Sequence, residues 1–277
     1  MKPLVIVLWL VFTVVILFFF DFFDLGWSTI FVILIGLLIF PFVFLPIITF
    51  CSHRLNANPR IEQIHPGKDV VPVEFWDVAR DAIDDLAGSG FKLKGHLRMS
   101  GWLSSAVTYY AVLENQMHCA IARLAVVFVP TKLVSRVSAM LAFTTEFANG
   151  SEVLTANNKE LVTQPGSAQA TVLWLPEVRE GDELYHYHQQ AVQKHDFDSK
   201  ALPIEHEPVE YLRRLAEKEI ARWVKYGYYR LDSRTKKYRP TLKGAALLSW
   251  KLLPPIKNLR QAWRRHQTNK LLRKLEE

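Results

Sequence analysis

The first fifty residues constrain this chain most, because they are almost entirely apolar. Residues 1–52 contain only three charged side chains, Lys2, Asp21 and Asp24. They form two apolar runs, and a helix needs roughly 20 apolar residues to cross a bilayer. The second run is too long for an ordinary core helix, and no small-residue cleavage site follows the first. The sequence therefore predicts a transmembrane helical hairpin over 1–52, with helices at about 3–20 and 27–51.

The basic residues predict how this hairpin is oriented. Lys2 precedes the first helix, and Arg54 and Arg60 follow the second, whereas the connecting turn at 21–27 has carboxylates and no Lys or Arg. Because Lys and Arg stay on the cytoplasmic side, both termini are expected in the cytoplasm. The expected localisation is the cell inner membrane, as a multi-pass protein with two helices.

The middle of the chain has the pattern of an α+β domain at 73–175. After a polar, proline-containing linker at 53–72, residues 73–87 have helical periodicity, and several alternating apolar runs follow. Asn149-Gly150 separates two of these runs, which predicts a hairpin with a type I′ turn. We expect one helix packed on an antiparallel sheet of four or five strands.

The remaining residues, 176–277, are expected to form a basic helical region containing one β-hairpin at 227–240. Residues 211–277 contain 19 Lys and Arg against 5 Asp and Glu, a net charge of +14, while residues 1–210 have a net charge of −7. An apolar row follows the hairpin at helical spacing, namely Leu252, Ile256, Leu259 and Trp263. This row either packs on the α+β domain or lies at an interface with anionic lipid, and amphipathicity alone does not distinguish the two.

No strong catalytic, cofactor or metal motif is present, so no cofactor and no metal ligand are assigned. Glu114, His118 and Cys119 stand close together in the sequence, but they are expected in a turn between strands. His186, His188 and His195 lack the i, i+4 spacing that zinc ligands on a helix usually have. An enzyme is therefore the less favoured class.

The segment 210–253 has a "K-x-Y-x-x-T-x-x-G" pattern at Lys236, Tyr238, Thr241 and Gly244. It resembles the wing and following helix of winged-helix regulators, which implies nucleic-acid binding. However, a single long helix at about 207–226 precedes the hairpin, whereas the winged-helix family has a turn between two helices there.

The chain also resembles a group of uncharacterised bacterial membrane proteins that combine a two-helix anchor with a cytosolic domain. The likeness lies in an "F-x-T-x-F-x-[DN]-G-x-x-x-x-T-x-N" pattern, which here consists of Phe143, Thr145, Phe147, Asn149, Gly150, Thr155 and Asn157. The resemblance implies architecture and location, and it adds no site residue.

The function expected from these patterns is a non-enzymatic binding or scaffolding module at the cytoplasmic membrane surface, with the basic region on anionic lipid headgroups. The candidate lipid- or nucleic-acid-binding residues are Arg234, Lys236, Lys237, Arg239, Arg264, Arg265, Lys270, Arg273 and Lys274. The first alternative is a membrane-tethered, winged-helix-like nucleic-acid binder, and the second is an enzyme with its site in the α+β domain. A protein partner is left open.

Overall fold

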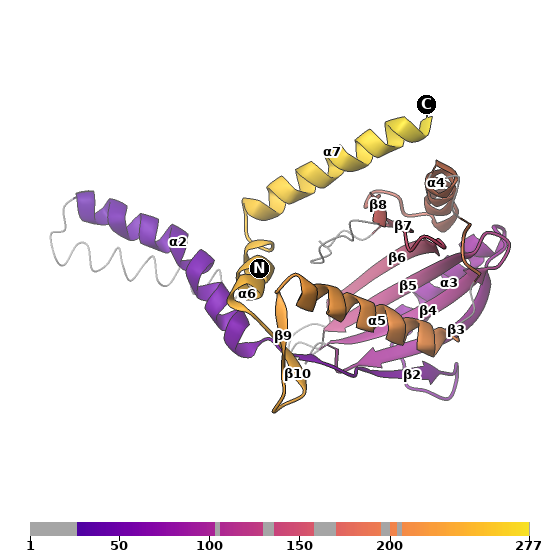
Figure 1. Ribbon diagram of the computed structural model, residues 1–277, viewed down its shortest axis with the longest axis horizontal. Coiled ribbons are helices and arrows are strands. Elements are labelled where there is room, and N and C mark those ends of the chain that lie inside the picture. The colour runs from indigo at the N-terminus through magenta and orange to yellow at the C-terminus, as the bar shows by residue number, and fades with distance from the viewer. Residues whose placement is uncertain are drawn as a thin grey trace. The chain divides into compact units, whose positions relative to one another are not determined.

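The structure is a computed structural model that describes residues 27–102, 106–129, 136–157, 170–194, 200–203 and 207–276. The chain divides into two units, Met1–Leu45 and Pro46–Glu277. In the first unit the described residues belong to helix α2 (Trp27–Ser52), whose last turns belong to the second unit. The other described helices and strands all lie in the second unit (Figure 1).

The predicted transmembrane hairpin is contradicted, because no helix in the described part of the chain is both long and apolar enough to cross a membrane. The first predicted helix, 3–20, lies outside the described residues. The inner-membrane localisation rested on this hairpin, so the same finding contradicts it.

The α+β class is confirmed, with a sheet of seven strands rather than four or five. The strands lie side by side in chain order, and neighbours are antiparallel except for the parallel pair β7 and β8. They are β2 (Arg60–Ile64), β3 (Lys92–Ser100), β4 (Val107–Asn115), β5 (Ala120–Val129), β6 (Arg136–Glu146), β7 (Glu152–Ala156) and β8 (Ala170–Trp174).

The two additional strands lie at the edges of the sheet. β2 falls in the segment 53–72, which was expected to be a linker, and its sequence RIEQI has little apolar alternation. β8 is a five-residue strand, and among the described strands it pairs with β7 alone. Backbone pairing defines such edge strands more than side-chain pattern does, so sequence periodicity does not reveal them.

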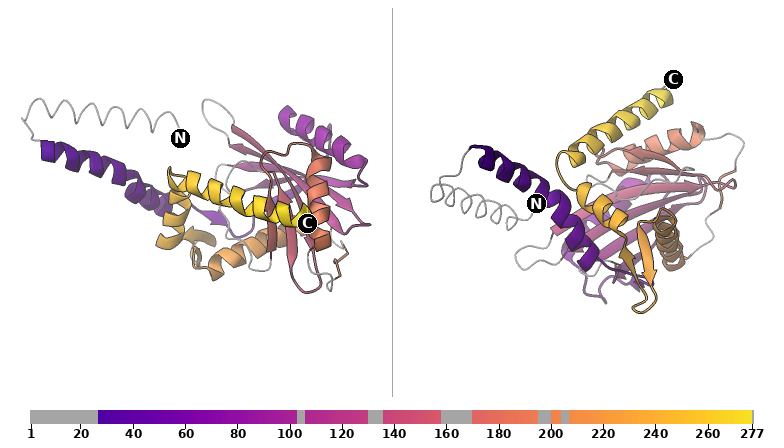
Figure 2. Two further views of the ribbon diagram at one scale, coloured as in Figure 1. Left: turned by 90° about the horizontal axis from the view of Figure 1, so that it is seen from above. Right: turned by 60° about the vertical axis from the view of Figure 1, so that its left-hand side comes forward.

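Helices cover both faces of the sheet (Figure 2). Helices α3 (Val73–Ala87) and α4 (Gly181–Lys194) pack on one face, where Leu113 and Phe143 are buried. Helix α5 (Pro208–Lys225) packs on the other, where Val112 contacts its Leu212. Val112 and Leu113 are adjacent in β4, so the two cores follow from the alternation of side chains along a strand.

A second, three-stranded sheet has the order β1 (Leu55–Asn56), β10 (Lys237–Pro240) and β9 (Tyr229–Asp232). Leu55 and Tyr229 of this sheet are buried against Trp223 of α5. The β9–β10 hairpin lies where the sequence predicts one. Helices α6 (Leu242–Trp250) and α7 (Ile256–Glu276) follow it.

Thr241 and Gly244 of the wing-like pattern join α6 to the end of α5. The Thr241 hydroxyl donates to the Gly227 carbonyl at 2.7 Å and accepts from the Gly244 N–H at 3.1 Å, which caps the helix. A Cβ atom added at Gly244 would lie 1.9 Å from the Tyr228 carbonyl oxygen. These two residues therefore have a structural role that requires no nucleic acid.

His188 of α4 contacts three residues of the "F-x-T-x-F-x-[DN]-G-x-x-x-x-T-x-N" pattern, namely Phe143, Thr145 and Thr155. Its ring is 1% exposed, with Nε2 3.0 Å from the Thr145 hydroxyl and Nδ1 3.1 Å from the Thr155 hydroxyl. Phe143 packs on the ring at a centroid distance of 5.7 Å. Burial lowers the pKa of His188 to about 3, so the ring is neutral and joins α4 to β6 and β7.

The turn between β6 and β7 differs from the type I′ turn expected at Asn149-Gly150. Gly150 has φ +79°, but Asn149 does not have a positive φ, which a type I′ turn would require. The turn is closed by the Gly150 N–H, which donates to the Phe147 carbonyl at 2.9 Å. The Asn149 side chain accepts from the Ser151 N–H at 2.9 Å.

Candidate anion-binding region

The tip of the β9–β10 hairpin carries three exposed predicted site residues, Arg234, Lys236 and Lys237. Asp232 shapes this tip, since its carboxylate accepts from the Arg234 N–H at 3.1 Å. The fourth predicted cation, Arg239, is half-buried and lies 2.6 Å from the Asp232 carboxylate. Arg239 is therefore already paired within the hairpin, whereas the side chains of the other three extend into solvent.

The tail cations lie on α7, but on different faces of it. Arg264 is half-buried with its guanidinium over the Trp174 ring, 5.3 Å from the centroid, and Arg265 forms an ion pair with Glu177 at 3.1 Å. Lys270 and Arg273 are exposed. The side chain of Lys274 lies outside the described residues.

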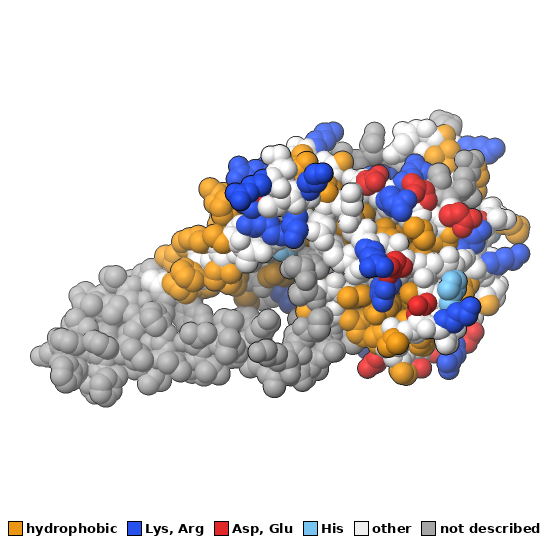
Figure 3. All heavy atoms as spheres, turned by 90° about the horizontal axis from the view of Figure 1, so that it is seen from below, with side chains coloured by type: hydrophobic (Ala, Val, Ile, Leu, Met, Phe, Trp, Pro, Cys, Tyr) orange, Lys and Arg blue, Asp and Glu red, His pale blue; other side chains and the backbone are white. Residues whose placement is uncertain are grey.

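The structure does not bring the two groups of cations together. In Figures 1 and 2 the hairpin and α7 lie on opposite sides of α6. Figure 3 shows one face of the molecule, where blue Lys and Arg side chains gather in one area and alternate with red carboxylates elsewhere. The exposed predicted residues therefore lie on two separate elements, the hairpin tip and α7.

The apolar row on α7 does not pack on the sheet as a whole. Leu252, Leu259 and Trp263 are 59%, 66% and 63% exposed, while Ile256 is half-buried. The packing face of α7 is instead the one that carries Arg260, Arg264, Thr268 and Leu271. The core-packing interpretation of the row is therefore wrong for its three exposed members.

Two residues that the sequence analysis missed complete a cluster of three cations. Lys251, at the C-terminal end of α6, is only 7% exposed. Arg260, one turn before Arg264 on α7, is half-buried, and its Nη1 atom is buried with no hydrogen-bond partner among the described residues. The available signal was the i, i+4 spacing of Arg260 and Arg264, which places them on one helix face.

The surroundings of Lys251 and Arg260 disfavour the charged forms of these two side chains. Burial and, to a smaller extent, the charges of Arg260 and Arg264 together lower the pKa of Lys251 to about 8. Burial and the charge of Arg264 also lower the pKa of Arg260. A negative charge near these side chains would act on the two pKa values in the opposite direction.

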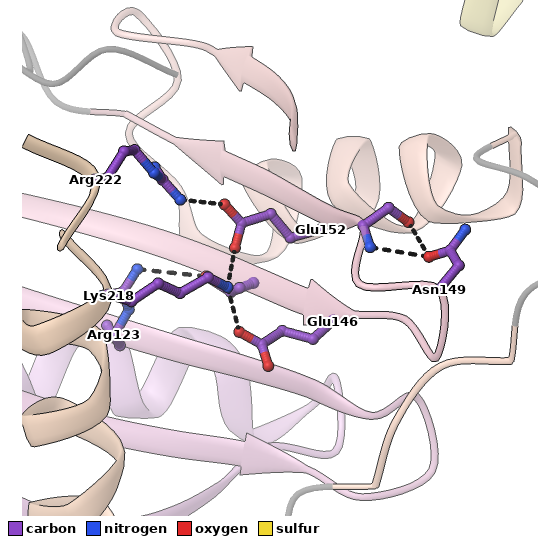
Figure 4. Close-up of polar contacts among 8 residues, drawn as sticks. Arg123, Glu146, Asn149, Glu152, Lys218 and Arg222 are labelled. Carbon is purple, nitrogen blue, oxygen red and sulfur yellow. Dashed lines mark hydrogen bonds and ion pairs between the residues drawn. The ribbon is translucent and has the colours of Figure 1, made fainter. Parts of the chain in front are cut away.

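Ion pairs join helix α5 to strands of the sheet (Figure 4). Lys218 Nζ lies 3.0 Å from the Glu146 carboxylate and 2.8 Å from the Glu152 carboxylate, and Arg222 lies 3.4 Å from Glu152. Burial alone would raise the pKa of Glu152, but its bonds to Lys218 and Arg222 outweigh burial and lower it. These two cations of α5 therefore serve packing.

The wing-like region has one feature of a winged helix and lacks another. The strand order β1-β10-β9 places a hairpin beside a third short strand, with α5 before it. However, α5 buries Leu212, Ala216 and Ile220 along its length. A recognition helix must enter a major groove, and α5 instead has one face on the sheet.

The other candidate groups do not converge. The Glu114 carboxylate is buried and paired with Lys94 at 3.1 Å, whereas His118 packs near Tyr185 with a ring-centroid distance of 6.5 Å. Cys119 has φ +50° and its Sγ contacts the Gln116 carbonyl. His195 lies outside the described residues, and within the described ranges no three His, Cys, Asp or Glu side chains are placed to hold a metal ion.

A cavity of about 520 Å³ lies between α3, β6 and the segment before α4. Its walls carry Asp81, Asp85 and Arg179 above apolar side chains such as Leu124 and Val178. The Asp85 carboxylate accepts from the Gly181 N–H at 3.3 Å, so one of the two acids already has a structural partner.

Comparisons of the chain with models of protein families, with curated proteins and with solved structures find no match.

Proposed function

We propose that the protein is a non-enzymatic binding module whose C-terminal basic region, residues 211–277, holds a phosphate-bearing polyanion. The observation that carries the proposal is the division of charge, +14 in this region against −7 in the rest of the chain. Exposed cations at the hairpin tip and on α7 present that charge to solvent. A partner rich in phosphate is attracted by such surfaces over several ångströms at physiological salt.

The test is binding of the full-length protein to fluorescently labelled inorganic polyphosphate, measured by anisotropy over a series of salt concentrations. We expect affinity to fall steeply with salt, because each phosphate contact releases a counterion. The double variants Lys236→Ala/Lys237→Ala and Lys270→Ala/Arg273→Ala should each weaken binding about threefold or more. The matched control is Lys68→Ala/Arg80→Ala, which removes the same charge from exposed positions outside the region.

Further arms identify the source of the phosphate. Duplex DNA and vesicles containing phosphatidylglycerol are compared with polyphosphate, and polyglutamate serves as a polyanion without phosphate. Binding that is equal in the control variant and in the two test variants would contradict the proposal. Stronger binding to polyglutamate than to polyphosphate would also contradict it.

A second candidate function is nucleic-acid binding by the β9–β10 hairpin, which the strand order of the small sheet favours. This function predicts a preference among duplex sequences, because base contacts rather than phosphate contacts carry sequence information. The packing of α5 on the large sheet argues against it. The measurement with duplex DNA distinguishes these two functions. Equal affinity for unrelated duplex sequences would mean that the protein contacts phosphates and not bases.

A further inference from the structure

We propose that the cavity between α3, β6 and the segment before α4 binds a small organic cation, a molecule with an apolar body and one ammonium group. The cavity has a volume of about 520 Å³. Binding sites for small molecules have volumes of about 300–1,000 Å³, so a ligand of this class fits. The described residues that line the cavity lie between 78 and 181. The proposal is therefore independent of polyanion binding by residues 211–277.

Contacts that need no ligand fix the walls of the cavity. At the start of α4, a Cβ atom added at Gly181 would lie 3.3 Å from the Asp85 Cβ atom and 3.4 Å from a Leu141 methyl group. The Gly181 N–H also donates to the Asp85 carboxylate at 3.3 Å. After the end of β7, the Asn157 side chain accepts from the Leu141 N–H at 2.8 Å, and the Asn157 N–H donates to the Leu141 carbonyl at 3.1 Å. A preformed site lowers the entropy cost of binding.

The most buried side chains of the lining are apolar. Leu124 of β5 and Leu141 of β6 are 3% and 5% exposed, and Ala82 of α3 is 8% exposed. Val78 and Val178 are half-buried and also line the cavity. Burial of apolar surface favours binding, so the part of a ligand that contacts these side chains should be apolar.

The charged side chains of the lining favour a cation. Asp81 and Asp85 are four residues apart on α3, so they share one face of the helix. Arg179 is the cation among the described lining residues. Two carboxylates therefore face one guanidinium, and the excess of negative charge attracts a ligand with a single positive group.

The C-terminal end of α3 strengthens this preference. Asp81, Asp84 and Asp85 all lie in its last two turns, and its last turn contains no basic residue. The C-terminal end of a helix has a partial negative charge, so carboxylates there are unfavourable for the helix and attractive to a cation. Because Asp85 already accepts from the Gly181 N–H, Asp81 is the residue that we assign to the ammonium group.

The test is isothermal titration calorimetry of the full-length protein with tryptamine, which joins an indole ring to an ammonium group. Tryptophol is the comparator, because it has the same ring with a hydroxyl group in place of the ammonium. We expect tryptamine to bind about threefold or more tightly than tryptophol, which is the size of effect that one ion pair near solvent produces.

Three variants locate the site. Asp81→Asn should weaken tryptamine binding about threefold or more and leave tryptophol binding nearly unchanged. Asp84→Asn is the matched control, because it removes the same charge from the same end of α3 at an exposed position outside the lining, and it should change binding less than about twofold. Ala139 is exposed and lines the cavity, so the ring of Ala139→Trp should occupy the cavity and weaken both ligands about tenfold or more.

The proposal is overturned if wild type does not bind tryptamine, or if it binds tryptamine and tryptophol equally. Equal effects of Asp81→Asn and Asp84→Asn would also contradict it, as would an Ala139→Trp variant that binds like wild type. Circular dichroism checks that Ala139→Trp folds, and the two exposed aspartates give the decisive comparison if it does not. None of these results bears on polyphosphate binding, so this proposal and the proposed function can fail separately.

Discussion

Two regions of the molecule each bury a titratable side chain. The core beneath α4 buries His188, and the place where α6 meets α7 buries Lys251, in opposite surroundings. His188 lies between the hydroxyl groups of Thr145 and Thr155 and remains neutral. Lys251 lies beside two further cations, Arg260 and Arg264, which disfavour its charged form. His188 therefore has the partners that a buried polar group needs in a stable fold, whereas the surroundings of Lys251 favour its neutral form. The comparison separates a ring that the fold holds neutral between two hydroxyl groups from an ammonium group whose charge the fold disfavours.

The largest effect is expected from a substitution that disrupts the packing of α6 and leaves the large sheet intact. Gly244→Ala should lower the free energy of unfolding by about 3 kcal/mol, because the new Cβ atom would lie 1.9 Å from the Tyr228 carbonyl oxygen. The measurement is urea unfolding followed by fluorescence and circular dichroism. The control is Gly88→Ala, where an added Cβ atom meets nothing within 4 Å. Equal stability of the two variants would contradict the packing of α6 described above.

Removing the hydroxyl partners of His188 tests the structural half of the comparison. Thr145→Val and Thr155→Val should each cost about 1–3 kcal/mol, because each leaves one ring nitrogen buried without its partner. Chemical denaturation at pH 7 measures this cost. A change below 0.5 kcal/mol in both variants, on the order of a neutral surface substitution, would show that His188 does not depend on these contacts.

Acidification tests the same group through its protonation. The pKa of His188 is about 3 in the folded protein and 6.5 for an unperturbed histidine in the unfolded chain, so the unfolded chain binds a proton first as the pH falls. Stability should therefore decrease from pH 6.5 towards pH 3, by about 1.4 kcal/mol per pH unit for this one group. His188→Gln should lack this component. If the two proteins lose stability in parallel between pH 6 and pH 4, the assignment to His188 is wrong.

Replacing Lys251 should raise the free energy of unfolding, whereas the substitutions around His188 should lower it. Lys251→Met removes a buried charge that two neighbours repel, so we expect the variant to be more stable than wild type by about 1 kcal/mol at pH 7. The advantage should disappear as the pH rises from 8 to 10.5. In that range the unfolded chain binds more protons on Lys251 than the folded chain does, so wild-type stability rises. A destabilised variant at pH 7 would show that Lys251 has a structural role like that of His188.

The smallest expected effect concerns an ion pair that is largely in solvent. Lys218→Ala should lower stability by less than about 1 kcal/mol, because the Lys218 side chain is 45% exposed and its attraction to Glu146 and Glu152 is screened. Urea unfolding at low and high salt measures it. A loss that exceeds that of Thr145→Val would mean that α5 is held mainly by charge rather than by Leu212 and Ile220.

Sequence periodicity predicted the parts of the fold that apolar alternation defines. It located the helix at 73–87 and the β9–β10 hairpin, because Phe75, Ala79 and Leu86 share a helix face and the hairpin has a clear turn. It missed β2 and β8, which are edge strands with little pattern of their own. The predicted transmembrane hairpin rested on the length and apolar content of two runs, and the described helices do not bear it out.

The candidate site could be predicted only in part. The charge excess of residues 211–277 identified the basic region, and Arg264 was among the predicted residues. Lys251 and Arg260 were missed because a basic residue in a basic segment gives no sign of burial. Their burial depends on how α7 leaves α6 and packs near β8, which is a tertiary property. The roles of Thr145 and Thr155 also appear only once α4 places His188 between them.

The most direct test of the central claim measures the affinity of wild type and of Lys236→Ala/Lys237→Ala for polyphosphate at physiological salt. Each phosphate contact releases a counterion, so the loss of two exposed cations should lower the affinity. We predict that the double variant binds at least threefold more weakly than wild type, whereas Lys68→Ala/Arg80→Ala binds as wild type does. Equal affinity of the double variant and this control would contradict the account.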